Sequence, residues 1–281
     1  MEPNNPIRIA VCTDFTSIAT HAFHEALRFA RLMDAEIHLI HIINPENETM
    51  GSAEKKMVNM IKGAEDLSKG VDVKFVVAQG NGDITESINE QVTDINPDYF
   101  VVGYEVKKGM DRFFGPNIMK IVRGCKYPVI AIKENETLDD MKNILFPINL
   151  NGYARQKTVP TIQLALDLKA KIQLVGLSVD FTEADAKKLK IYMKQLTEHF
   201  EKYGVEYITD WLTGDDDTDL VIDYANQNDS DMIAKVFEHD PSMVELFTGN
   251  EDEKVIAKTN MPLFIVKSHE YMVGSWSTMR G

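Results

Sequence analysis

The chain has 281 residues, of which 44% are hydrophobic and 26% charged, values that suit a globular protein of about two domains. Its net charge of −14 would repel nucleic-acid phosphates, and no run of Lys or Arg opposes this charge, so no nucleic-acid partner is expected. Only two cysteines occur, and no apolar stretch approaches the length of a membrane span. These features predict a cytoplasmic protein with buried thiols and no membrane partner.

The first half of the chain alternates short apolar runs with amphipathic stretches, which is typical of a parallel sheet covered by helices. Ala22, Ala26 and Phe29 share one face of the first expected helix, and Met57, Met60, Ile61, Ala64 and Leu67 share one face of the second. Strands are predicted at residues 8–13, 36–43, 72–78, 98–102 and 128–132.

Two further helices are expected in this half. The third begins at Asp83, which is a suitable N-cap with Glu86 three positions later, and it ends before Pro97. The fourth runs from about Pro116 to Cys125.

The second half repeats the first at an offset of 134 to 135 residues. Arg8–Asp14 aligns with Asn143–Asn149, and Pro128–Lys133 aligns with Pro262–Lys267. A repeat of this length predicts a duplicated domain in which each copy buries its own core. Strands are expected near residues 143–148, 171–178, 205–213, 231–235 and 262–266, with a long helix whose inner face carries Leu189, Met193, Leu196 and Phe200.

The predicted fold is therefore α/β, with two tandem doubly wound open-sheet domains. Each has five mainly parallel strands in the order 3-2-1-4-5 and four helices. The expected boundaries are 1–137 for the first domain, 138–267 for the second and 268–281 for a C-terminal tail, joined by a polar linker at 134–140. In such sheets ligands bind where the strands end and the strand order reverses.

The chain resembles the universal stress protein family in both halves. In the first, Ile9–Asp14, Pro97–Gly103 and Tyr127–Ile130 match the family pattern of a strand ending in Asp, a later strand ending in Gly and a last strand introduced by Pro. Ile144–Asn149, Ser230–Ile233 and Met261–Phe264 match it in the second.

The resemblance implies ATP, with Mg²⁺, as a possible ligand of the first domain. ATP-binding members carry a G-x-x-G loop followed nine residues later by Gly and a hydroxyl residue, because glycines let backbone amides approach phosphates. Here Val106 replaces the second glycine and Pro116 replaces the hydroxyl residue, and these departures favour weak or lost ATP binding. The cofactor-binding residues implied by the resemblance are Thr13, Asp14, Phe15, Ile42, Gly103, Gly109, Gly115 and Asn117.

Copy two departs further from the family pattern. Asn149 stands in place of Asp14, and Val236 and His239 stand in place of the two loop glycines. Its nucleotide site is therefore expected to be degenerate. In copy one, Lys107, Lys108 and Arg112 either compensate for the lost loop amides or form a solvated basic turn.

Other polar groups suggest no catalytic or metal site. His21 and His24 share a helix face without an acidic partner, and His38 and His41 point to opposite faces of a strand. Asp215–Asp219 is interpreted as the cap of a helix, because acidic residues complement the helix dipole there.

Two functions remain open. The first is a non-catalytic regulatory or interaction protein of the stress response, with nucleotide binding weak or lost and an unknown protein partner. The second is an ATP-binding protein that uses domain 1 alone, with slow ATP hydrolysis as a further option. The last strands of both halves are expected to meet in an intrachain pseudo-dimer, and the tail, which contains Tyr271 and Trp276, is expected to pack and to support a homodimer.

Overall fold

The computed structural model describes residues 6–105, 116–179, 182–237 and 251–268. The chain divides into two compact units, residues 1–140 and 141–281, and each unit is described by itself. The expected tail lies outside the described residues apart from Ser268, whose amide donates to the carbonyl of Phe237 at 2.9 Å.

The first unit contains a parallel sheet in the order β3-β2-β1-β4-β5, as the sequence predicts. Its elements are β1 (Arg8–Cys12), α1 (Ser17–Leu32), β2 (Glu36–Ile43), α2 (Met50–Gly63), α3 (Glu65–Ser68), β3 (Val73–Gln79), α4 (Ile84–Ile95), β4 (Tyr99–Gly103), α5 (Pro116–Gly124) and β5 (Val129–Ile132).

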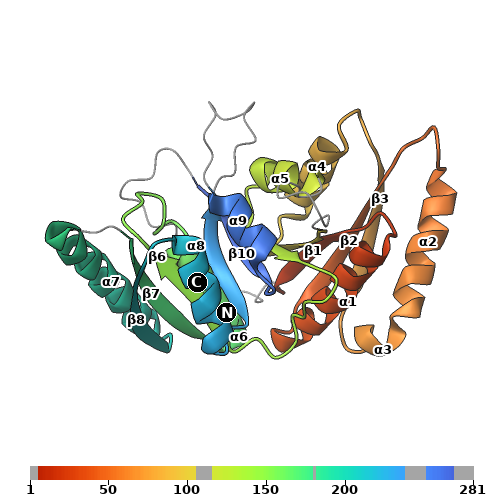
Figure 1. Ribbon diagram of the computed structural model, residues 1–281. Helices are drawn as coiled ribbons and strands as arrows, with labels where there is room; N and C mark the ends of the chain where they lie inside the picture. The colour runs from red at the N-terminus through yellow and green to blue at the C-terminus, as the bar shows by residue number, and fades with distance from the viewer. Residues whose placement is uncertain (1–5, 106–115, 180–181, 238–250, 269–281) are drawn as a thin grey trace. The chain divides into compact units, whose positions relative to one another are not determined.

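Helices cover both faces of this sheet (Figure 1). α1, α2 and α3 lie on one face and α4 and α5 on the other, which follows from a strand order that runs outward in two directions from β1. β1 and β4 are buried in the centre, and Ala22, Ala26 and Phe29 of α1 are fully buried against them, as their spacing predicts.

The second expected helix is divided into α2 and α3 near Ala64, whose φ of −107° and ψ of 20° depart from helical values. Met57 and Ala64 of the predicted apolar stripe are buried, whereas Met60, Ile61 and Leu67 are half-buried. α4 begins after its N-cap Asp83, whose side chain accepts from the amides of Thr85 and Glu86.

The expected polar linker at 134–140 is instead packed against α1, which corrects the prediction. Glu25 of α1 is buried, and its Oε2 accepts from Thr137 Oγ1 at 2.7 Å and from the Leu138 amide at 2.9 Å. The His21 Nε2 lies 2.7 Å from the Glu136 carbonyl oxygen, and Leu138 is fully buried. Because the partners of this segment sit on a helix about 110 residues away, the local polar composition could not indicate this anchoring.

The second unit repeats the parallel sheet in the order β8-β7-β6-β9-β10. Its elements are β6 (Asn143–Ile148), α6 (Thr158–Leu168), β7 (Lys171–Val179), α7 (Glu183–Tyr203), β8 (Tyr207–Gly214), α8 (Asp217–Gln227), β9 (Met232–Phe237), α9 (Glu251–Lys258) and β10 (Leu263–Lys267).

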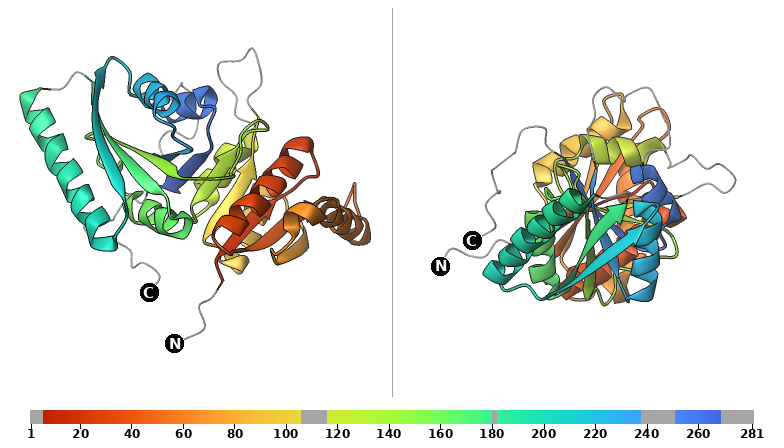
Figure 2. Two further views of the ribbon diagram at one scale, coloured as in Figure 1. Left: turned by 90° about the horizontal axis from the view of Figure 1, so that it is seen from below. Right: turned by 60° about the vertical axis from the view of Figure 1, so that its left-hand side comes forward.

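Local capping sets the ends of the helices in this unit. α7, which lies along β7 (Figure 2), begins with a capping box between Thr182 and Asp185 and ends at Gly204 with a left-handed φ of 70°. Asp216 caps α8 by accepting from the amides of Thr218 and Asp219. The interpretation of the aspartate run as a helix cap is therefore confirmed.

Candidate functional site

The described part of the expected nucleotide site lies at the carboxyl ends of the central strands of the first unit. Thr13–Phe15 follow β1, Ile42 lies near the end of β2 and Gly103 ends β4. Asn117 lies in the first turn of α5, and its side chain is not described. Gly109, Gly115, Val106, Lys107, Lys108 and Arg112 lie outside the described residues.

Asp14 closes its own turn. Its Oδ1 accepts from the Thr16 amide at 3.0 Å and from the Thr16 hydroxyl at 2.5 Å, and Thr16 in turn caps α1. Asp14 is exposed, and one of its carboxylate oxygens is thus already engaged at the start of the helix.

Phe15 adopts a left-handed backbone conformation with a φ of 64°, which is uncommon for an aromatic residue. Its ring lies on the His41 ring at 4.4 Å between centroids, and Lys56 Nζ lies 5.4 Å from the ring centre. On the other side of the turn, the Thr13 hydroxyl lies 3.6 Å from Met60 Sδ of α2. Side chains of β2 and α2 therefore occupy the end of β1.

His41 is the functional-site residue that sequence reasoning missed in this unit. It is buried, its Nδ1 lies 2.8 Å from the Thr13 carbonyl oxygen, and its Nε2 lies 2.8 Å from Glu48 Oε2. A neutral ring has one donor, so only the imidazolium donates to both oxygens. Hydrogen bonds from Lys56 and then His41 hold the pKa of Glu48 below its ordinary value. A signal existed in the sequence, because the second copy has Gly176 at this position of the repeat.

Gly103 allows α1 to approach β4 closely. A Cβ at this position would lie 2.7 Å from the Ile18 carbonyl oxygen and 3.2 Å from Ala22 Cβ, which is a severe overlap with helix backbone. The family glycine therefore has a packing role in this chain, in addition to any role in the loop that follows it.

The second unit differs because its first helix begins later. At the repeat offset of 135, the first residue of α1, Ser17, corresponds to Gly152, whereas α6 begins at Thr158, six residues further on. Residues 152–157 form turns instead. This change removes the first helical turns that would cover the end of β6.

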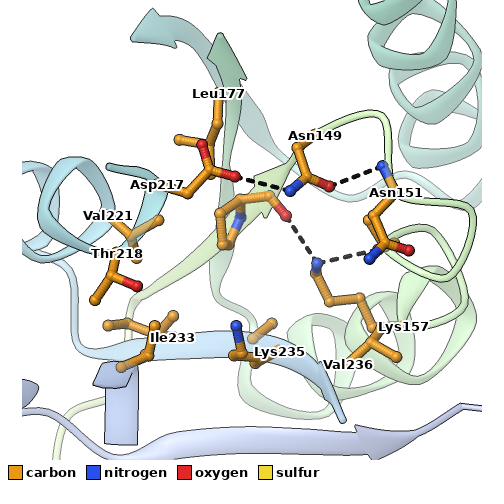
Figure 3. A pocket seen from close by; sticks show the side chains of 14 residues that line it. Asn149, Asn151, Lys157, Leu177, Asp217, Thr218, Val221, Ile233, Lys235 and Val236 are labelled. Carbon is orange, nitrogen blue, oxygen red and sulfur yellow. Dashed lines mark hydrogen bonds between the residues drawn. The ribbon is translucent and has the colours of Figure 1, made fainter. Parts of the chain in front are cut away.

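A cavity of about 200 Å³ lies at this place, at the carboxyl ends of β6, β7 and β9 (Figure 3). One part of its wall is apolar and is formed by residues that include Leu177, Val221, Ile233 and Val236. The polar part consists of Asn149, Asn151, Lys157, Asp217, Thr218 and Lys235.

Lys157 is buried at the wall of this cavity, with 3% of its surface exposed. Its Nζ donates to the Pro147 carbonyl at 2.7 Å and to the Ala154 carbonyl at 3.0 Å, and it lies 4.5 Å from the centre of the Phe146 ring. These contacts fix the ammonium group in place without adding a negative charge. The position was detectable in the sequence, since Lys157 replaces the buried Ala22 of the first copy.

Asn149 and Asp217 connect the two sides of the cavity. The Asn149 Nδ2 donates to Asp217 Oδ2 at 2.8 Å, and the Asn149 Oδ1 accepts from the Asn151 amide at 3.0 Å. Asn149 thus makes the same kind of turn contact as Asp14 in the first unit and also reaches the start of α8. Asn149 and Val236 stand in copy two where Asp14 and Gly103 stand in copy one, and both lie on this wall.

The remaining candidates have local roles within the described residues. His38 pairs with Glu36, with 2.7 Å between His38 Nε2 and Glu36 Oε1, while His41 lies in its own cluster. In the described ranges no group of three or more His, Cys, Asp or Glu could hold a metal ion. Burial, with Asp14 nearby, raises the pKa of the Cys12 thiol to about 12. No described helix is both long and apolar enough to cross a bilayer.

Comparison with known proteins agrees with this fold. The family model described as "Universal stress protein family" matches residues 7–133. A universal stress protein from Archaeoglobus fulgidus is 14% identical, with 92% of this chain and 98% of that chain covered and a TM-score of 0.71. A putative universal stress protein from Pseudomonas aeruginosa is also 14% identical, with 93% of each chain covered and a TM-score of 0.63. No curated protein matches the chain.

The first unit is thus a universal stress protein domain. The second unit has the same strand order, so the chain carries two tandem domains of one fold.

Proposed function

We propose that this protein is a regulatory member of the family that acts in a stress response by binding, and that nucleotide binding in its first unit is weak or lost. The observation that carries the proposal is the occupied end of β1. Met60 lies against the Thr13 hydroxyl, and Phe15 packs on His41, where a nucleotide would approach the strand. Ligand binding there would require these side chains to move, at a cost in free energy.

Titration of the full chain with Mg-ATP by calorimetry tests this proposal. We expect a Kd weaker than about 100 µM, a binding free energy smaller than roughly 5.5 kcal/mol in magnitude. A low-micromolar Kd would contradict it.

The second candidate function is ATP binding by the first unit alone. It is favoured by the convergence of Thr13, Asp14, Ile42 and Gly103 at one edge of the sheet, as the resemblance implies. This alternative predicts one tight site per chain, which Asp14→Ala removes. Unchanged affinity in Asp14→Ala would exclude the predicted residues as the site.

We also propose that the protein is cytoplasmic and self-associates. The last strand of each half is apolar at Val129–Ile132 and Leu263–Val266, and apolar strands at a sheet edge readily pair. Sedimentation of the full chain at several concentrations tests whether dimers form. A monomer mass at every concentration would contradict self-association between chains.

A further inference from the structure

The turn that follows β1, residues 13–16, contains a strained residue, and we call it the β1 turn. Phe15 has a left-handed φ of 64°, which is a rare conformation for an aromatic residue. Asp34 after α1 and Lys169 after α6 are left-handed at corresponding positions of the two units. Leu150, the counterpart of Phe15 in the repeat, is not left-handed. The strain at Phe15 therefore belongs to the first unit alone and is not a feature of the repeat.

Contacts from β1, β2 and α2 hold Phe15 in this conformation. Its ring packs on the His41 ring at 4.4 Å between centroids, and Lys56 Nζ lies 5.4 Å from its ring centre. Its amide donates to the Thr13 hydroxyl at 3.0 Å. The Thr13 carbonyl oxygen in turn lies 2.8 Å from His41 Nδ1. His41 therefore contacts both the strained residue and the peptide that leads into the β1 turn.

Both ring nitrogens of His41 face groups that only accept hydrogen bonds. Nδ1 faces the Thr13 carbonyl oxygen, and Nε2 lies 2.8 Å from Glu48 Oε2. Hydrogen bonds from Lys56 and His41 hold the pKa of Glu48 below its ordinary value, so Glu48 is a carboxylate at neutral pH. A neutral imidazole has one N–H and can serve only one of these acceptors. The carboxylate keeps that N–H, because hydrogen bonds to charged acceptors are the stronger ones. Loss of the second proton therefore breaks the bond to the Thr13 carbonyl.

The charged groups near this ring are few among the described residues. Lys56 Nζ is bound to Glu48 Oε1 at 2.7 Å, and Asp14 is exposed in the β1 turn itself. Val77, which pairs with His41 from β3, is uncharged. Of the side-chain types in this cluster, histidine is the one that ordinarily changes charge between about pH 5 and 8. We therefore expect a change of pH in this range to act on the turn through His41.

We infer that His41 is a proton-dependent latch on the β1 turn, closed while the ring is positively charged and open when the ring loses its proton. In the closed state Phe15 packs on His41 and Met60 lies against the Thr13 hydroxyl, so the end of β1 is occupied. In the open state the Thr13 carbonyl has lost its partner, and relaxation of the strained Phe15 frees the end of the strand. This inference rests on the proposed function, since it names the control of the site at which nucleotide binding is weak or lost.

A pH titration of the full-length protein, followed by NMR, tests the latch directly. The His41 ring reports the charge, and the Phe15 ring and a 13C-labelled Met60 methyl group report the conformation of the turn. We expect both turn reporters to change between pH 5 and 9 with the same midpoint as the His41 ring. Turn reporters that stay constant while His41 titrates would overturn the inference. A His41 ring that keeps one charge throughout this range would overturn it as well.

Replacement of the ring gives a second test. The side-chain amide of His41→Gln has one donor nitrogen and cannot donate to both acceptors, so its turn reporters should keep the high-pH positions of the wild type at every pH. His38→Gln is the matched control, because His38 is a half-buried histidine of the same strand that pairs with Glu36 instead. Its turn reporters should titrate like those of the wild type. Wild-type titration of the turn in His41→Gln would overturn the latch.

The carboxylate partner sets the midpoint of the latch. Glu48→Gln removes the negative charge that favours the charged ring, so the His41 midpoint should fall by about one pH unit, a tenfold loss of proton affinity. Glu46→Gln, at an exposed acid two residues away, should leave the midpoint unchanged. Equal midpoints in the wild type and Glu48→Gln would overturn the role of Glu48 in the latch.

Calorimetry with Mg-ATP separates the latch from the proposed function. At pH 6 we expect His41→Gln to bind Mg-ATP about 10-fold more tightly than the wild type, since a closed latch reduces the binding-competent fraction. Comparing the two proteins at one pH removes any effect of pH on the nucleotide itself. Equal affinities would overturn control of nucleotide binding by the latch. A low-micromolar Kd of the wild type at pH 6, with turn reporters that still follow His41, would contradict the proposed function and leave the latch in place.

Discussion

The two units share one strand order and differ most at the end of their first strand. In the first, α1 begins at Ser17 and packs so closely on Gly103 that no side chain fits between them. In the second, α6 begins six residues later, Val236 replaces the glycine, and a cavity lined by Lys157 opens beside the strand. The comparison teaches that helix length, and not the glycine pattern alone, determines where a ligand has space.

The two units also differ at the end of the second strand, where the first unit has a large side chain and the second has a glycine. His41 fills this place in the first unit and reaches Glu48 ahead of α2. Gly176 stands there in the second, where a Cβ would lie 2.6 Å from Met193 Sδ and 3.2 Å from Trp211 Cε3. The space at the end of the second strand is therefore filled by His41 of β2 itself in the first unit. In the second unit it is filled by Met193 of α7 and Trp211 of β8.

Replacing His41 by glycine, the residue at this position of the second unit, should lower the free energy of unfolding the most. His41→Gly removes a buried ring and both of its hydrogen bonds. Met193 and Trp211, which fill the space beside Gly176, belong to the second unit and cannot replace the ring. We expect a loss of about 4 kcal/mol in the free energy of unfolding, measured by urea titration. His38→Gly, on the same strand but half-buried, controls for glycine in a strand and should lose less than half as much. Equal losses in the two variants would show that the His41 cluster adds no stability.

The second-largest loss of stability is expected when Gly103 is replaced by valine, the residue at this position of the second unit. Gly103→Val introduces the side chain of Val236 where the Ile18 carbonyl lies 2.7 Å from the new Cβ. Because the obstacle is backbone, we expect a loss of about 3 kcal/mol. Gly152→Val is the control, since no atom lies within 4 Å of its added Cβ. Wild-type stability of Gly103→Val would mean that α1 can shift away from β4, as the second unit suggests is possible.

The sequence predicted the sheet order, both sets of strands, the ends of α4 and α5 and the cap of α8, because these depend on local periodicity, caps and an internal repeat. It did not predict the cavity, which lies beside the late start of α6 and is lined by a buried lysine that forms hydrogen bonds to the backbone of Pro147 and Ala154. It also missed the roles of His41 and Glu25, whose partners lie on other elements. Contacts between elements are set by tertiary packing, which the pattern of one element does not encode.

Substitution of Glu48 measures how much its contacts with His41 and Lys56 stabilise the packing of α2 at the end of β1. Glu48 Oε1 lies 2.7 Å from Lys56 Nζ, and Glu48 Oε2 lies 2.8 Å from His41 Nε2, so Glu48→Gln should lose about 2 kcal/mol at pH 7. The lowered pKa of Glu48 means that its contribution is present above its ordinary value of 4.5 and is lost as the pH falls through the lower folded value. The difference between wild type and variant should therefore shrink below about pH 4.5.

Urea titrations between pH 3 and 7 check this dependence. Glu46→Gln is the matched control, because Glu46 is an exposed acid two residues away in the same loop. A constant difference between wild type and Glu48→Gln across this range would rule out Glu48 as the source of the acid dependence.

The smallest expected effect concerns the boundary between the units. If residues up to Asp140 belong to the first unit, the bond from Thr137 to the buried Glu25 should stabilise that unit. Thr137→Val keeps the shape of the side chain and removes its donor, so we expect a loss of about 1 kcal/mol, with Glu25 still bound by Arg28 and by the Leu138 amide. Thr93→Val removes a hydrogen bond to the Asn89 carbonyl on an exposed helix surface and should change the free energy of unfolding by less than half as much. Hydrogen exchange of the Leu138 amide gives a second measurement, because a weaker anchor exposes that amide more often. An unchanged exchange rate together with unchanged stability would mean that residues 134–140 connect the units without belonging to the first.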